Sequence, residues 1–94
     1  MRQADIVQGN LYAIRIKDTF AIVRFLGRSF QAGRKFAAVN LDTKRTLHLS
    51  SAARLRPLYR QELADGKIAI LTEVDGHLRR IREWTYLEGL YGPR

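Results

Sequence analysis

Histidine and serine are the residues of this chain that could supply a base and a nucleophile, and they come together at one place. His48 is followed closely by Ser50 and Ser51. Such a pair needs a carboxylate to orient the imidazole, but Asp42, the nearest acid in sequence, lies at the far end of the same predicted hairpin. His77 is no better placed. We therefore interpret both histidines as solvent-facing residues and predict a protein that is not an enzyme.

The chain also lacks the residue patterns that a metal site or a cofactor site would need. The chain has two histidines and no cysteine, and its nine acidic residues are scattered, so no metal-ligand spacing occurs. Glu62 and Asp65 fit surface solvation better than acid–base catalysis. The glycines fall at predicted turns, and none forms a phosphate-binding loop ahead of a helix. We predict no cofactor and no metal.

Positive charge is what this chain has in excess. The net charge is +8 over 94 residues. Residues 11–60 hold eleven Lys and Arg against two Asp, whereas residues 61–94 hold five cations against six acids. A charge that served solubility alone would have no reason to gather in one half, but a charge that attracts a polyanion would. The predicted partner is therefore nucleic acid, DNA or RNA, or an acidic protein surface.

The candidate binding residues are cations of the first half that are predicted to project from strands, turns and loops. Arginine suits phosphate because its planar fork matches two oxygens, and aromatic side chains among cations can stack on unpaired bases. The candidate cations are Arg15, Lys17, Arg24, Arg28, Arg34, Lys35, Lys44, Arg45, Arg54 and Arg56. The candidate stacking residues are Phe20, Phe30 and Phe36.

The elements that must position these residues read as antiparallel strands. In "LYAIRIKDTFAIVRFLG", residues 11–27, a turn at Asp18–Thr19 would pair 16 with 21, 14 with 23 and 12 with 25. This register gathers one apolar face and leaves the cations on the other. The apolar face would hold Tyr12, Ile14, Ile16, Ala21, Val23 and Phe25. The opposite face would hold Ala13, Arg15, Lys17, Phe20, Ile22 and Arg24.

A second hairpin is predicted in "KFAAVNLDTKRTLHL", residues 35–49. With residues 42–44 in the turn, 41 would pair with 45, 39 with 47 and 37 with 49. The apolar face would hold Ala37, Val39, Leu41, Leu47 and Leu49. The opposite face would hold Phe36, Ala38, Asn40, Thr46 and His48. "SSAARL" then predicts a single 3₁₀ turn that Ser50 or Ser51 caps.

The remaining segments are assigned from turn signals. Residues 1–10 read as a loose leader, and "PLYRQELAD" predicts a short helix because Pro57 and Gly66 bracket it. "KIAILTEV", residues 67–74, predicts a strand. For residues 77–90 we favour a helix, with Ile81, Trp84, Leu87 and Tyr91 along one side. The alternative is a hairpin turned by Asp75–Gly76.

The order of features from Leu11 to Leu58 resembles the SH3-like small barrels and, among them, the Tudor domains. "LYAI", "FAIVRFLG" after a short turn, the hairpin "KFAAVNLDTKRTLHL" and the ending "LRPL" carry this resemblance. It implies a mainly β (β+α) fold in which an antiparallel barrel of about five strands spans residues 11–58. Residues 59–94 would form a helix–strand–helix appendage packed on the same domain.

The resemblance implies two kinds of use. Tudor domains often hold methylated lysine or arginine in an aromatic cage by cation–π attraction, and other SH3-like barrels bind nucleic acid or proteins. The Asp-Tyr-Gly-Asn signature of many Tudor hairpins is replaced here by "LDTKRT". A cage for a cation should not be ringed with Lys and Arg, which favours the second use.

We therefore predict a cytoplasmic, non-catalytic binding module whose basic face contacts the nucleic-acid backbone, because the sequence shows no signal peptide and no membrane span. The alternative is a small phage or mobile-element inhibitor or adaptor that binds a host protein complex. A homodimer is also open, as is a basic pocket that holds a small nucleotide. The anchor for a protein partner would be Trp84, Leu87, Leu90 and Tyr91.

Overall fold

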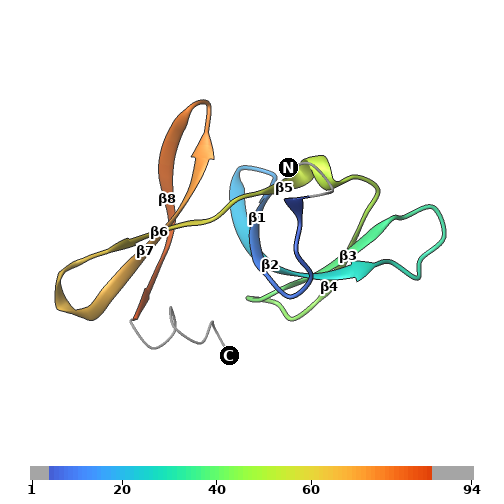
Figure 1. Cartoon of the computed structure of the whole chain (residues 1–94), viewed down its shortest axis with the longest axis horizontal. Helices are drawn as coiled ribbons and strands as arrows, with labels where there is room; N and C mark the ends of the chain where they lie inside the picture. The colour runs from blue at the N-terminus through green and yellow to red at the C-terminus, as the bar shows by residue number, and fades with distance from the viewer. Residues whose placement is uncertain (1–4, 86–94) are drawn as a thin grey trace. The chain divides into compact units, whose positions relative to one another are not determined.

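The strands of residues 5–85, the part of the chain that this computed structural model describes, form two separate antiparallel sheets (Figure 1). The chain divides into two compact units, Met1–Pro57 and Leu58–Arg94. The first unit contains β1 (Leu11–Ile16), β2 (Thr19–Arg28), β3 (Phe36–Asn40), β4 (Thr46–Leu49), the 3₁₀ turn η2 (Ala52–Arg54) and β5 (Leu55–Arg56). The second contains β6 (Tyr59–Glu62), the 3₁₀ turn η3 (Ala64–Gly66), β7 (Lys67–Val74) and β8 (His77–Thr85).

The mainly β prediction is confirmed, and the predicted helices are wrong within the described residues. Between residues 5 and 85 the chain has no α-helix, and nothing helical there is long and apolar enough to cross a membrane. The last residues of the predicted C-terminal helix, 86–90, lie outside the described part.

The first hairpin has the predicted faces but an earlier turn. Ile16 pairs with Thr19 and Ile14 with Ala21, so Lys17 and Asp18 form the two-residue loop. This register differs from the prediction by two residues, and each side chain therefore keeps its predicted face. Lys17 adopts a φ of 56° at the first loop position, where hairpins usually place glycine or asparagine.

The second hairpin is shifted by one residue, which reverses the predicted faces of β3. Phe36 pairs with Leu49 and Ala38 with Leu47, so Phe36 and Ala38 face the core. The cause is a four-residue loop, because Asn40 N–H donates to the carbonyl of Arg45 at 2.9 Å. Lys44, the last loop residue, has a φ of 62°.

Asn40 explains why the loop closes in this way. Its side chain is buried, and its Oδ1 accepts hydrogen bonds from the backbone N–H groups of Asp42 at 2.9 Å and Thr43 at 3.4 Å. An asparagine that bonds its own chain two residues on is a typical turn former. The side chain thus takes the place of a turn residue and lengthens the loop.

Replacing Asn40 with alanine is expected to lower the free energy of unfolding by about 1 kcal/mol, because two backbone donors lose their acceptor. Urea unfolding followed by far-UV circular dichroism would measure the loss. Asn40→Asp is the matched control, since it keeps the acceptor oxygen and should retain most of the stability. Equal losses in both variants would contradict the proposed role of Oδ1.

The core of the first unit lies on one face of its sheet, whose strand order is β4-β3-β2-β1-β5. Leu49 of β4 and Leu55 of β5, the two edge strands, both belong to it, so the sheet curls around a single cluster without closing into a barrel. Ser51 caps η2 by accepting from Ala53 N–H at 3.1 Å, as predicted. The core residues are Tyr12, Ile14, Ala21, Val23, Phe25, Phe36, Ala38, Leu49, Ala52 and Leu55.

Part of the segment predicted as a loose leader is attached to this core. Gly9 N–H donates to the carbonyl of Phe25 at 2.8 Å, and Phe25 N–H donates to the carbonyl of Asn10 at 3.0 Å. Ile6 packs against the core cluster, and Val7 N–H donates to the hydroxyl of Tyr12 at 2.7 Å. Residues 6–10 therefore extend the pairing of β2.

The second unit is a sheet in the order β6-β7-β8. The strand predicted at residues 67–74 is confirmed as β7. Asp75 and Gly76 have φ values of 51° and 82°, which are the two positive angles of a type I′ hairpin turn. This turn directs residues 77–85 back along β7 as a strand, so the alternative interpretation of this segment was the correct one.

Two features of the second sheet hid it from sequence patterns. The ladder between β7 and β8 is irregular at Ile70/Leu71, where Ile81 is an extra residue on β8. Alternation is therefore broken within β8, and its three arginines look unsorted along the sequence. β6 is exposed at all four residues and gains its order from pairing with β7.

Candidate nucleic-acid interface

The ten candidate cations differ in whether their side chains contact the protein. Arg15 Nε donates to the carbonyl of Lys17 at 3.2 Å, Arg24 Nη1 donates to that of Gly9 at 2.8 Å, and Arg54 Nη2 donates to that of Arg15 at 3.4 Å. These arginines brace the first hairpin and its neighbours. Their removal would change structure as well as charge.

Arg15 and Arg56 also enclose Phe20. Their guanidinium carbons lie 6.0 and 5.6 Å from the centre of its ring, at cation–π distance. Phe20 is 8% exposed. The cross-strand pairs explain the arrangement, because Arg15 stands opposite Phe20 and Arg56 opposite Ala13 on the same face. The structure thus gives Phe20 partners within the protein, and we assign it no stacking role.

The other six cations have no side-chain hydrogen bond or ion pair to another residue within 5–85. They form two groups at opposite ends of the strands, because β1–β2 and β3–β4 turn at one end of the sheet and β2–β3 at the other. The turn cations are Lys17, Lys44 and Arg45. The loop cations are Arg28, Arg34 and Lys35.

A β-bulge places Arg28 beside the core. The register between β2 and β3 shifts between Phe25 and Gly27, where Gly27 has a φ of 105°. Phe25 and Arg28 are three residues apart, so regular alternation would send them to opposite faces. The extra residue lets both face the core side, and Arg28 pairs with Phe36 at its rim.

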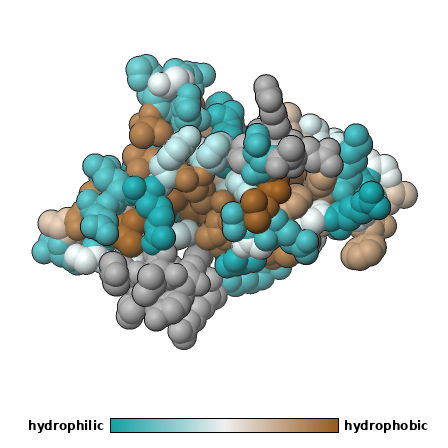
Figure 2. Space-filling view, in the orientation of Figure 1, coloured by the Kyte–Doolittle hydropathy of each residue, from teal (hydrophilic) through white to brown (hydrophobic). Residues whose placement is uncertain are grey.

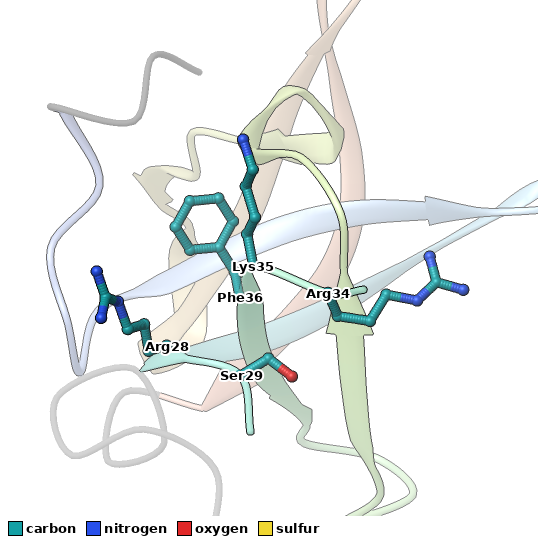
Figure 3. Close-up of a pocket in the computed structure, with 5 residues that line it drawn as sticks. All are labelled: Arg28, Ser29, Arg34, Lys35 and Phe36. Atoms are coloured by element: carbon teal, nitrogen blue, oxygen red, sulfur yellow. The ribbon is translucent and has the colours of Figure 1, made fainter. Parts of the chain in front are cut away.

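The loop cations line a pocket of about 400 Å³ together with Ser29 and Phe36. Figure 3 shows the Phe36 ring between Arg28 and Lys35, with Arg34 reaching out on the other side. Phe36 is 8% exposed, so it forms part of the wall and is no projecting platform. The pocket therefore combines three cations with one aromatic wall, and no acidic residue among residues 5–85 lines it.

Hydrogen bonds hold the loop that carries this pocket. Ser29 N–H donates to the carbonyl of Lys35 at 3.0 Å, and Lys35 N–H donates to that of Leu49 at 2.9 Å. Arg34 N–H donates to the carbonyl of Gln31 at 3.2 Å, with Gly33 at a φ of 77° in the third position of that turn, as type II turns require.

A side-chain pair adds to this support. Ser29 Oγ accepts from Gln31 N–H at 3.0 Å and shares a 2.7 Å hydrogen bond with His48 Nδ1. His48 thus pairs with Ser29, which no sequence pattern singles out, and not with Ser50 or Ser51.

Phe30, near the start of this loop, is the most exposed large apolar residue of the described chain, with a relative exposure of 102%. Of the three candidate stacking residues, it is the one with an open ring. Exposing a phenylalanine fully to water brings no stability. It lies in the same loop as Arg28, Arg34 and Lys35.

The net charge divides along the unit boundary. Residues 1–57 contain eleven Lys and Arg against three Asp, a net of +8, whereas residues 58–94 contain six cations and six acids. Both ion pairs found in the described part, Lys67–Glu83 at 3.4 Å and Arg80–Glu83 at 3.9 Å, belong to the second unit. Figure 2 shows mixed hydrophilic and apolar residues at the end of the first unit where the β2–β3 loop lies.

The structure offers fewer observations on the predicted protein-partner anchor and on a metal site. Trp84, predicted as an anchor for a protein partner, is 9% exposed and stands opposite Ile68. Leu87, Leu90 and Tyr91 lie outside the described residues. Across residues 5–85 no group of three or more His, Asp and Glu is arranged to hold a metal ion.

Comparison with protein-family models, with curated proteins and with solved structures finds no match to this chain.

Proposed function

We propose that the first unit is a non-catalytic module that binds the backbone of nucleic acid through its cations. The observation that carries this proposal is the pocket of the β2–β3 loop, where three cations line one cavity and have no ion-pair partner among residues 5–85. Arg28 and Arg34 offer planar forks for phosphate oxygens, and Lys35 adds a point charge. The confinement of the net charge to this unit supports a polyanionic partner.

The first unit also supports the proposal of an SH3-like architecture. The 3₁₀ turn η2 precedes the short strand β5, which pairs with β1, and the order of hairpins follows the order that the resemblance implies. On this proposal the end of the sheet that carries the loop cations is the recognition surface, and the turn cations lie at the other end.

The test is fluorescence anisotropy of the whole protein with labelled single-stranded and duplex oligonucleotides at several salt concentrations. We expect the logarithm of the binding constant to fall linearly with the logarithm of salt. Three phosphate contacts predict a slope of about −2 for single strands, since each contributes about −0.7. Absence of binding at low salt would overturn the proposal and favour an acidic protein partner, as an inhibitor or adaptor would have.

A further inference from the structure

We propose that the β2–β3 loop is a site for one unpaired nucleotide, whose base stacks on Phe30 while its phosphate enters the pocket of the loop cations. The proposal rests on the proposed function and deepens it, because it names single-stranded nucleic acid as the ligand. Duplex would then bind through charge alone.

The first argument is the position of Phe30 between the cations. One residue separates it from Arg28 in the sequence, and Arg34 and Lys35 follow it after three more residues. Its ring is fully exposed. Stacking on an aromatic ring tolerates any base, and cations before and after the ring in the same loop supply charge for the adjoining phosphates. An acidic protein partner would use the cations but gives no reason for an exposed aromatic ring in the loop.

The second argument is that the loop is held in place before any ligand binds. Its two ends are joined by the hydrogen bond from Ser29 N–H to Lys35, and its interior is braced by Ser29 Oγ, which contacts both Gln31 and His48. A ring on a braced loop loses little conformational entropy when it stacks. A hydrophobic residue on a loosely held loop would lack such hydrogen bonds.

The third argument is the pocket. Its volume of about 400 Å³ falls within the range of roughly 300–1,000 Å³ that is typical of small-molecule sites. Its cations suit a phosphate, and the Phe36 wall suits the apolar faces of sugar or base. A surface that only follows a duplex backbone needs no such cavity.

Paired bases should not use this site. In a duplex each base is already stacked, and exposing a base face to Phe30 would first require unstacking, which costs a few kcal/mol. A single strand, whose bases are already accessible, avoids most of that cost. The ring should therefore strengthen binding of single strands selectively.

The experiment compares the parent protein with Phe30→Ala on three labelled ligands: a single strand, a duplex of the same sequence and an abasic single strand of equal length. Stacking of one base is worth about 5- to 150-fold in affinity. We expect Phe30→Ala to lose affinity in this range for the intact single strand, while its affinities for the duplex and the abasic strand stay unchanged. Leu78→Ala, which removes another exposed apolar side chain in the second unit, is the control and should change none of them.

A direct readout comes from Phe30→Trp. The indole should stack at least as well, and its fluorescence should be quenched by the intact single strand and not by the abasic one, beyond any change seen with Trp84 alone in the parent. If all ligands bind with a steep salt dependence but Phe30→Ala has no effect, this inference fails while the proposed function stands. If Phe30→Ala weakens duplex as much as single strand, the ring acts as a wedge between paired bases and the inference also fails. If no nucleic acid binds, both fail.

Discussion

Neutralising the three loop cations together, as Arg28→Gln, Arg34→Gln and Lys35→Gln, is expected to weaken single-strand binding by on the order of 100-fold at low salt. These side chains line one pocket and have no hydrogen-bond or ion-pair partner among residues 5–85, so their charge is available to a ligand. The slope of log affinity against log salt should become shallower by about 2, since each lost phosphate contact removes about 0.7. Anisotropy titrations at several salt concentrations measure both quantities.

The matched control neutralises the turn cations instead, as Lys17→Gln, Lys44→Gln and Arg45→Gln. It removes the same net charge from the same unit but at the opposite end of the sheet. We expect a clearly smaller loss than with the loop variant. Equal losses would mean that overall charge, and not the pocket, governs binding. Because all six side chains are exposed, both variants should keep the parent's stability within about 0.5 kcal/mol.

Replacing Leu55 with alanine is expected to lower the free energy of unfolding by about 2–5 kcal/mol. Leu55 has no exposed surface, and it lies in a strand of two residues that pairs with β1 through Ile14 and Ala13. The loss is large beside the roughly 5–15 kcal/mol that stabilises an ordinary domain. The variant should therefore unfold at a clearly lower urea concentration than the parent.

Urea unfolding followed by far-UV circular dichroism would measure this effect. Leu26→Ala is the control, since Leu26 is 41% exposed on β2 and should cost far less. Similar losses in both variants would show that β5 does not seal the core. Loss of oligonucleotide binding by Leu55→Ala would be explained by unfolding, which is why the binding tests use exposed residues.

The first hairpin shows how much of the fold is accessible from the sequence. Alternation over residues 11–27 fixed which side chains face the core, and an error of two residues in the register left those faces unchanged. The second hairpin had equally clear apolar positions on both strands. There the error was one residue, because the side chain of Asn40 acts as part of the turn, and the faces of β3 were reversed. Hydrophobic pattern therefore gave the strands, and turn chemistry decided the pairing.

The second unit was harder because local signals pointed both ways. Ile81, Trp84 and Leu87 follow a helical spacing, whereas Asp75–Gly76 matches a type I′ turn. The turn prevailed, since β7 offers residues 77–85 a continuous ladder of partners. Sequence periodicity cannot anticipate an extra residue such as Ile81, which allows a strand with broken alternation to pair along its whole length.

For the candidate interface, the sequence identified the charged residues but not which of them interact with other residues of the chain. Nothing in the residue types separates Arg15, which lies over Phe20, from Arg34, whose side chain has no hydrogen bond or ion pair to a described residue. The pocket depends on the bulge at Gly27 and on the bond between Ser29 and His48, and both arise from long-range pairing. Phe30 was one of three candidate rings, and burial separated it from the other two.

Lys17 and Lys44 bring out a conflict between folding and charge. Both occupy left-handed backbone positions, with φ values of 56° and 62°, which cost a side chain other than glycine or asparagine roughly 1 kcal/mol. Selection for folding alone would place glycine or asparagine there. Replacing either lysine with glycine or asparagine should thus stabilise its turn. Each such replacement would remove one positive charge. Stability and positive charge are therefore opposed at these two positions, and no substitution there raises both.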